Sequence, residues 1–162
     1  MPSQSTIDAT ASQASLAAAR RLSEGGDARQ AEAAWRLVLE TTPHHAEAWY
    51  QLGWLALSAG HYGQAREHLR QATVAAPSVS ILHATLARAC KLAGEPEQAL
   101  AALERAVATD PSAWGARFEQ ADVLASLGRR RAAEMVYQLA ITITPPGQLQ
   151  VPEVKALVAR AG

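Results

Sequence analysis

The side chains that could do chemistry in this chain are five histidines, one cysteine and fifteen acidic residues. The histidines are His44, His45, His61, His68 and His83. No two of them are four residues apart, the spacing that would place a pair of metal ligands on one helix face. We interpret the first four histidines and the acidic residues as solvated surface groups, and His83 as a packed one. Cys90 is a lone thiol and no glycine-rich phosphate loop is present, so the sequence predicts no catalytic site, no metal site and no cofactor.

These side chains sit within a pattern that recurs every 34 residues. Proline stands at Pro43, Pro77, Pro111 and Pro145. Glycine stands at Gly26, Gly60, Gly94 and Gly128. A large apolar or aromatic residue stands at Trp35, Leu69, Leu103 and Tyr137. Self-similarity at a fixed period of this length indicates stacked copies of one supersecondary unit.

One copy of the pattern, residues 46–77, reads as two amphipathic helices. The inner face of the first helix has residues at i, i+3, i+4 and i+7, namely Trp49, Leu52, Gly53 and Ala56. Gly60 ends this helix, because the turn needs a left-handed backbone that glycine adopts without strain. The inner face of the second helix holds Ala65, Leu69 and Ala72, and Pro77 prevents its continuation. Such a hairpin cannot bury its apolar faces alone, so it must pack against its neighbours.

With Trp, Leu-Gly, Ala, Ala and Pro at these offsets, the unit resembles the tetratricopeptide repeat (TPR) family. The resemblance implies an all-α, right-handed α-solenoid of four helix-turn-helix units, residues 12–45, 46–79, 80–113 and 114–147. We expect a flexible leader over residues 1–11. We also expect a capping helix over residues 148–162, where Val154, Leu157, Val158 and Ala161 have helical spacing. The family consists of binding scaffolds, so the resemblance implies interaction rather than catalysis.

Composition narrows the classes of partner. Fifteen basic residues balance fifteen acidic ones, which argues against a nucleic acid or an anionic membrane as partner. No apolar run approaches the roughly 20 residues of a membrane span, and the first residues lack the pattern of a signal peptide. A single cysteine suits a reducing compartment. We therefore expect a cytoplasmic protein.

In this family the first helix of each pair lines a concave groove, which implies a set of binding residues. They are Leu16, Arg20, Glu47, Tyr50, Trp54, Ala84, Arg88, Lys91, Phe118 and Asp122. Tyr50 and Trp54 lie one turn apart on a face that the core does not need, as binding anchors do. The small Ala84 predicts a recess beside Tyr50. Basic residues of the set would run along the groove, with Glu47 and Asp122 opposing them.

For two of these residues, Trp54 and Phe118, the sequence does not decide between a place in the groove and a place in the core. Trp54 could pack against the neighbouring helix instead of lining the groove. In the fourth unit Arg117 stands where the family favours Trp, and Gln120 where it favours Leu. Phe118 could therefore supply the core contacts that these two residues lack.

The hypothesis that follows is a non-catalytic scaffold that binds an extended peptide or a partner domain in its groove. A second, narrower resemblance supports one alternative. The segment GDARQAEAAWRLVLETTPHH, the segment LGRRRAAEMVY and the ending PPGQLQVPEVKALVARA look like the TPR region of bacterial aspartyl/asparaginyl β-hydroxylase-type proteins. That resemblance implies a recognition or positioning module of a larger enzyme, whose catalytic residues would lie outside these 162 residues. A homo-oligomer, in which the groove accepts a second copy of the chain, is the third hypothesis.

Overall fold

The computed structural model describes residues 4–150, and the side chains of residues 13–149. This part of the chain forms eight α-helices and one short 3-10 helix, and it contains no β-strand. The chain divides into two compact units, residues 1–77 and residues 78–162, which we describe in turn.

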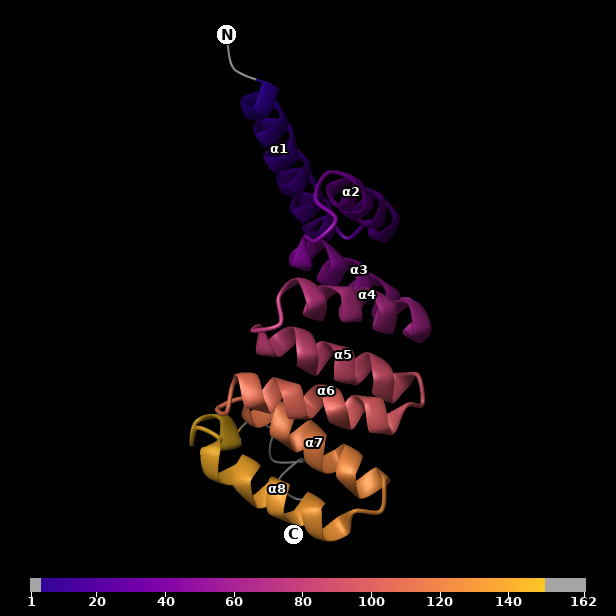
Figure 1. Ribbon diagram of the computed structural model, residues 1–162. Helices are drawn as coiled ribbons and strands as arrows, with labels where there is room; N and C mark the ends of the chain where they lie inside the picture. The colour runs from indigo at the N-terminus through magenta and orange to yellow at the C-terminus, as the bar shows by residue number, and fades with distance from the viewer. Residues whose placement is uncertain (1–3, 151–162) are drawn as a thin grey trace. The chain divides into compact units, whose positions relative to one another are not determined.

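The first unit consists of two helix hairpins (Figure 1). Its helices are α1 (Gln4–Glu24), α2 (Ala28–Thr41), α3 (Ala46–Ser58) and α4 (Tyr62–Ala75). Helix α1 begins at Gln4, within the leader that the sequence predicts over residues 1–11, so residues 4–11 are helical. They lack apolar periodicity, but they contain no glycine or proline that would stop a helix.

The core of the first unit is built around Trp35, whose side chain is fully buried. The Trp35 indole Nε1–H donates a hydrogen bond of 2.8 Å to Ser23 Oγ on α1, which satisfies the polar end of the ring. The other buried members of this cluster come from α1, α2 and α3 and are Ala19, Ala31, Val38, Ala48 and Leu52. Next to them α3 and α4 approach closely, with Gly53 facing the buried side chain of Leu69.

The second unit repeats the arrangement with two further hairpins. Its helices are α5 (Ser80–Leu92), α6 (Pro96–Thr109), α7 (Trp114–Ser126) and α8 (Arg130–Ile143), and the 3-10 helix η1 (Gln148–Gln150) follows. The core is larger, and its large buried side chains include Phe118, Leu103 and Tyr137. Alanines fill the remaining space between the helices, so the backbones can pack close together.

The turn inside each hairpin depends on a glycine in the left-handed region, with φ between 73° and 81° at Gly26, Gly60, Gly94 and Gly128. Three of these turns also share one hydrogen bond, in which the residue after the glycine donates back to a carbonyl five residues earlier. The three bonds are His61 N to Ala56 O, Glu95 N to Cys90 O and Arg129 N to Leu124 O, at 2.8 to 2.9 Å.

The prediction of an all-α fold of repeated helix hairpins is confirmed. The capping helix over residues 148–162 stays a prediction, because only the 3-10 helix η1 of this segment is described and residues 151–162 lie outside the described residues. The residues that carried that prediction, Val154, Leu157, Val158 and Ala161, fall in this part.

Candidate functional site

The first-helix face of the first unit, formed by α1 and α3, exposes an aromatic residue. The Trp54 side chain is 43% exposed, and Tyr50, one turn before it, is half-buried. The buried residues of α3 lie on its other sides and are Ala48, Leu52, Gly53 and Ala56. Leu16 of α1 is half-buried against the core. Trp54 thus lies outside the buried core of α3, and its role as a binding residue stays a prediction.

An ion pair joins α1 to α3 on this face. Arg20 Nε donates to Glu47 Oε1 at 2.7 Å, and Arg20 Nη2 donates to Glu47 Oε2 at 2.5 Å. This hydrogen bonding from Arg20 lowers the pKa of the Glu47 carboxyl, with a further contribution from the charge of Arg20. Glu47 thus opposes the charge of Arg20 directly, and a role of either residue in binding a partner stays a prediction. The two side chains neutralise each other because their helices are adjacent.

The first-helix face of the second unit, formed by α5 and α7, carries charged side chains. Arg88 and Lys91 of α5 are exposed. Partial burial raises the pKa of Glu119 on α7, while the charges of Lys91 and Arg88 act in the opposite direction. Glu119 was absent from the predicted binding residues. Glu119 comes one residue after Phe118, which is the predicted groove position of this turn, so the spacing of the repeat did not select it.

Phe118 belongs to the core, which corrects its assignment to the groove. Its side chain is 1% exposed and lies against Trp114 and Tyr137, with ring centroids 6.4 Å and 6.3 Å away. The reason is the departure of α7 from the repeat, because Gln120 takes an inner position where a leucine would pack.

Asp122 is half-buried and accepts a hydrogen bond from the Tyr137 hydroxyl, so it is tied to α8. Ala84 is half-buried and packs against the same core, and the recess predicted beside Tyr50 stays a prediction.

Two histidines have structural roles that the sequence did not predict. His45 is the N-cap of α3, and its Nδ1 accepts a hydrogen bond of 3.3 Å from Ala48 N. His68 is half-buried and stacks on Trp49, with ring centroids 5.6 Å apart. Burial lowers the pKa of His68, and the charge of Arg36 lowers it further, so this imidazole is neutral at pH 7. Neither histidine is the solvated group that we had inferred from its position.

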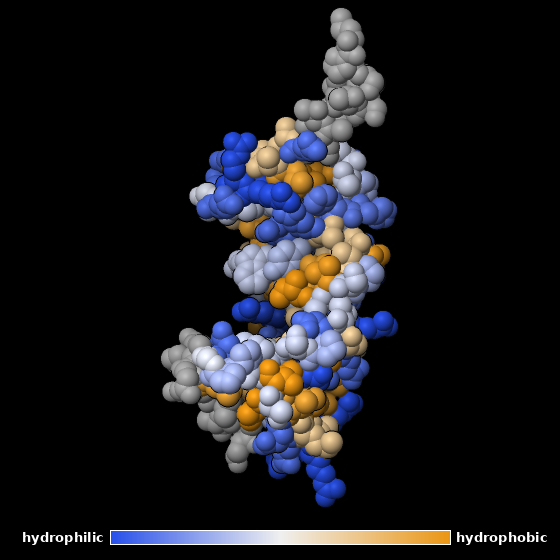
Figure 2. Space-filling view, turned by 90° about the vertical axis from the view of Figure 1, so that its left-hand side faces the viewer, coloured by the Kyte–Doolittle hydropathy of each residue, from blue (hydrophilic) through white to orange (hydrophobic). Residues whose placement is uncertain are grey.

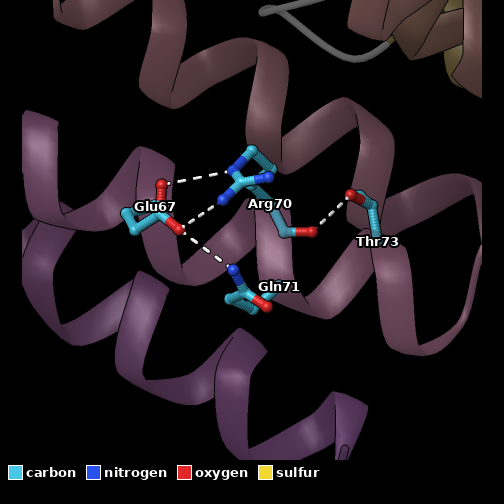
Figure 3. A network of polar contacts seen from close by, with 4 residues as sticks. All are labelled: Glu67, Arg70, Gln71 and Thr73. Carbon is cyan, nitrogen blue, oxygen red and sulfur yellow. Dashed lines mark hydrogen bonds and ion pairs between the residues drawn. The ribbon is translucent and has the colours of Figure 1, made fainter.

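No metal-binding cluster of three His, Cys, Asp or Glu side chains is found within the described part of the chain. Some charged groups serve the helices instead, as on the outer face of α4 (Figure 3). There Glu67 accepts hydrogen bonds from Arg70 and from Gln71, and Thr73 donates to the Arg70 carbonyl. These contacts are local to one helix and create no site.

The exposed apolar side chains are distributed over several helices. Figure 2 shows hydrophobic areas interleaved with polar ones on the face in view. Among the most exposed large apolar residues are Leu37 of α2, Val74 of α4 and Met135 of α8. None of the helices between residues 4 and 150 combines the length and the apolar character that a membrane span requires.

Comparison with known proteins agrees with this geometry. The Tetratricopeptide repeat family model matches residues 16–80 and 84–147, which is most of the chain. A search of curated proteins gives no significant match.

Several solved structures share the fold. The crystal structure of MamA superposes with a TM-score of 0.75 at 23% identity, covering 88% of this chain and 91% of that chain. YrrB, described as a TPR protein with an unusual peptide-binding site, has a TM-score of 0.72 at 22% identity, covering 88% of this chain and 78% of its own. The O-GlcNAc transferase of Thermobaculum terrenum has a TM-score of 0.70 at 27% identity, but the match covers only 27% of that chain.

The helix hairpins, the glycine turns at a 34-residue period and the extent of the family match lead to one conclusion. The chain belongs to the tetratricopeptide repeat family.

Proposed function

We propose that this chain is a non-catalytic protein-interaction scaffold that binds an extended peptide or a partner domain through its first-helix faces. The observation that carries the proposal is the 43% exposure of Trp54, which is not one of the buried core residues of α3. Large aromatic side chains that stay exposed without a structural need are typical anchors for a partner. The family and the peptide-binding site described for YrrB support the same class of function.

Each unit offers one determinant for a partner. In the first unit, Tyr50 and Trp54 present aromatic surface beside an ion pair whose charges cancel, which favours an aliphatic or aromatic residue of the partner. In the second unit, the exposed Arg88 and Lys91 favour an acidic group. The small Ala84 on α5 stays part of this proposal as the floor of a recess for an apolar side chain.

The experiment is a selection followed by a binding measurement. A displayed library of random 12-residue peptides is panned on the immobilised chain, and the enriched peptides are labelled for fluorescence anisotropy. We expect the enriched peptides to carry an apolar residue for the first unit, an acidic residue for the second unit, or both. Trp54→Ala should weaken their binding at least tenfold, which corresponds to about 1.4 kcal/mol and is within the range of an anchor residue. Arg88→Glu should weaken it through charge repulsion.

Met135→Ala is the matched control, because Met135 is a 75% exposed apolar residue on α8, outside the first-helix faces. It should leave binding unchanged. The melting temperatures of all variants should be close to that of the wild type, since each altered side chain is on the surface. Undiminished peptide binding by both Trp54→Ala and Arg88→Glu would remove these faces as the binding site.

A specific observation supports a second candidate, the recognition module of a larger enzyme. The O-GlcNAc transferase match covers 27% of a much longer chain, so this fold occurs there as one region of an enzyme. The link to a hydroxylase-type protein and a cytoplasmic location stay predictions from the sequence. Reading the gene beyond the codon for Gly162 tests the second candidate, because an open frame that encodes a catalytic domain would establish it.

A further inference from the structure

A pocket opens in the first unit between α2 and α4, with α3 as its floor. Its volume is about 260 Å³. Leu52 and Ala56 of α3 are buried at the bottom, and Leu55 is half-buried beside them. The rest of the lining comes from the start of α2, the end of α3 and the first half of α4, and consists of Ala28, Arg29, Glu32, Ala59, His61, Gln64 and His68. Figure 1 shows α3 between these two helices.

The pocket is separate from the proposed peptide-binding face. Successive residues of an α-helix are rotated by about 100°, because one turn holds 3.6 residues. On α3 this rotation places Leu52, Leu55 and Ala56 on the side opposite Tyr50 and Trp54. A ligand in the pocket would therefore leave the proposed peptide site uncovered.

The pocket exists because the first unit departs from the repeat. Sixty-eight residues later, at the same four repeat positions, the second unit has Leu100, Leu124, Leu127 and Val136. There Leu100 and Leu124 are buried, and Leu127 and Val136 pack against the same core. The first unit has at these positions the smaller or polar residues Glu32, Ala56, Ala59 and His68. A space that apolar side chains fill in one unit is thus left open and partly polar in the other.

Among the described residues, one cation that lines the pocket has no acidic partner. Glu32 is paired with Arg36 at 2.7 Å, and His68 is neutral at pH 7. Glu67, the other acid near His68, is bonded to Arg70 on its own helix. Arg29 lies at the mouth and makes no hydrogen bond or ion pair within the described part of the chain. His61 also lines the pocket, and its side chain makes no capping bond to α4.

We propose that this pocket binds a small carboxylic acid with an apolar body. The carboxylate would pair with Arg29 at the mouth, and the apolar body would lie on Leu52, Leu55 and Ala56. At the packing density of protein interiors, a volume of 260 Å³ holds about ten to twelve non-hydrogen atoms. This is the size of an arylacetic acid or of one acylated amino acid.

The test is a titration of the full chain at pH 7, followed by amide chemical shifts in NMR. Phenylacetate represents a free acid, and N-acetyl-valine presents its carboxylate as the last residue of a peptide does. Phenylacetamide and phenethylamine have the same apolar body with no charge and with a positive charge. We expect at least one acid to shift the amides of residues 28–32 and 55–68. It should bind about tenfold more tightly than phenylacetamide, the usual effect of one charge-assisted hydrogen bond.

Three variants locate the ligand, each taking the residue of the second unit. Ala56→Leu fills the floor and should abolish the shifts, and Ala59→Leu, which narrows the pocket beside it, should weaken binding if Ala56→Leu does not fold. Arg29→Glu should remove the preference for the acid over the amide while leaving weak binding of the amide. Arg105→Glu, an exposed charge reversal on α6, is the control and should change nothing.

Two results would overturn the proposal. One is equal affinity for the acids, the amide and the amine, which would show that Arg29 does not select an anion. The other is unchanged binding in a folded Ala56→Leu variant, or in Ala59→Leu, which would place the ligand elsewhere.

Discussion

At the scale of single residues, the packing of Gly53 against Leu69 shows how closely α3 and α4 approach. A Cβ atom on Gly53 would lie 2.6 Å from Leu69 Cγ and 2.9 Å from Leu69 Cδ2, inside any normal contact distance. The Leu69 side chain is fully buried, so it has little room to move away. Gly53→Ala should therefore destabilise the fold by about 1 to 3 kcal/mol, the usual cost of overpacking. Urea unfolding followed by circular dichroism measures this loss.

Gly63→Ala is the matched control for that substitution. Gly63 is also helical, in α4, but a Cβ atom there would meet nothing within 4 Å. Its replacement should leave stability unchanged or raise it by up to about 1 kcal/mol, because alanine is the better helix former. Equal destabilisation by the two substitutions would show that helix propensity, and not the contact with Leu69, explains the loss.

The carboxylate of Glu67 gives a prediction about pH. Hydrogen bonds from Arg70, and then from Gln71, lower its pKa to about 2 from the ordinary value of 4.5. Because the pKa is lower in the folded state, the contribution to stability is complete above about pH 4.5 and is lost as the pH falls through about 2. The group is solvent-exposed, so Glu67→Gln should cost less than about 1 kcal/mol at pH 7.

A pH series of urea titrations on the wild type and Glu67→Gln checks this sign. The difference between the two proteins should be constant from pH 7 to about pH 5 and should shrink toward pH 2. Glu104→Gln removes an exposed carboxylate from α6 that makes no hydrogen bond within the described residues, and it should show no such trend. A difference that grows as the pH falls would contradict the assignment.

The sequence predicted which residues of a helix are buried better than it predicted which side chains of different helices are in contact. The buried positions of α4, such as Leu69, follow from periodicity along one helix. The pairing of Arg20 with Glu47, and the stacking of His68 on Trp49, depend on which side chains from different helices meet. Periodicity predicts which face of its helix a residue occupies. It does not predict which side chain of a neighbouring helix that residue contacts, because this depends on side-chain length and rotamer. For the same reason the sequence did not predict the pocket beside Ala56. The pocket depends on how Glu32, Ala56, Ala59 and His68 lie relative to one another, and these residues belong to different helices or their ends.

At the scale of the element, the helix hairpin is held by the glycine at its turn. Gly94 has φ +79°, a conformation that is strained for any residue with a Cβ atom. It allows Glu95 N to donate to Cys90 O at 2.9 Å, which closes the end of α5. Gly94→Ala should therefore cost about 1 kcal/mol or slightly more in the free energy of unfolding, from the left-handed strain. Thermal and urea unfolding both report this change.

The control for the turn is Gly115→Ala in α7, where a new Cβ atom would meet nothing within 4 Å and the helical backbone suits alanine. It should not destabilise the protein.

The positions of all four turns could be predicted from the spacing of glycine and proline, because the turn places a direct steric demand on one residue. The start of α1 could not, because a polar stretch without a breaker is compatible with both helix and coil.

At the scale of the whole molecule, the chain consists of two compact units with separate cores. The number of hairpins could be predicted because the period counts them. The charged and aromatic faces could be predicted only in part. Phe118 is buried in the core, although its repeat position predicted the groove. Arg117 and Gln120 stand where the family has apolar residues, so Phe118 is the large apolar side chain on α7 that can fill this space.

In repeat proteins stability is approximately the sum of unit and neighbour terms, so a local defect should have a local effect. Leu103→Ala empties a fully buried position in α6 and should cost about 2 to 5 kcal/mol. In native-state hydrogen exchange, the amides of α5 to α8 should then lose most of their protection, while those of α1 to α4 should lose much less. Leu52→Ala, in the core of the first unit, should produce the opposite pattern. If both variants lower protection equally in all eight described helices, the two units unfold as one cooperative body, and the additive description does not hold for this chain.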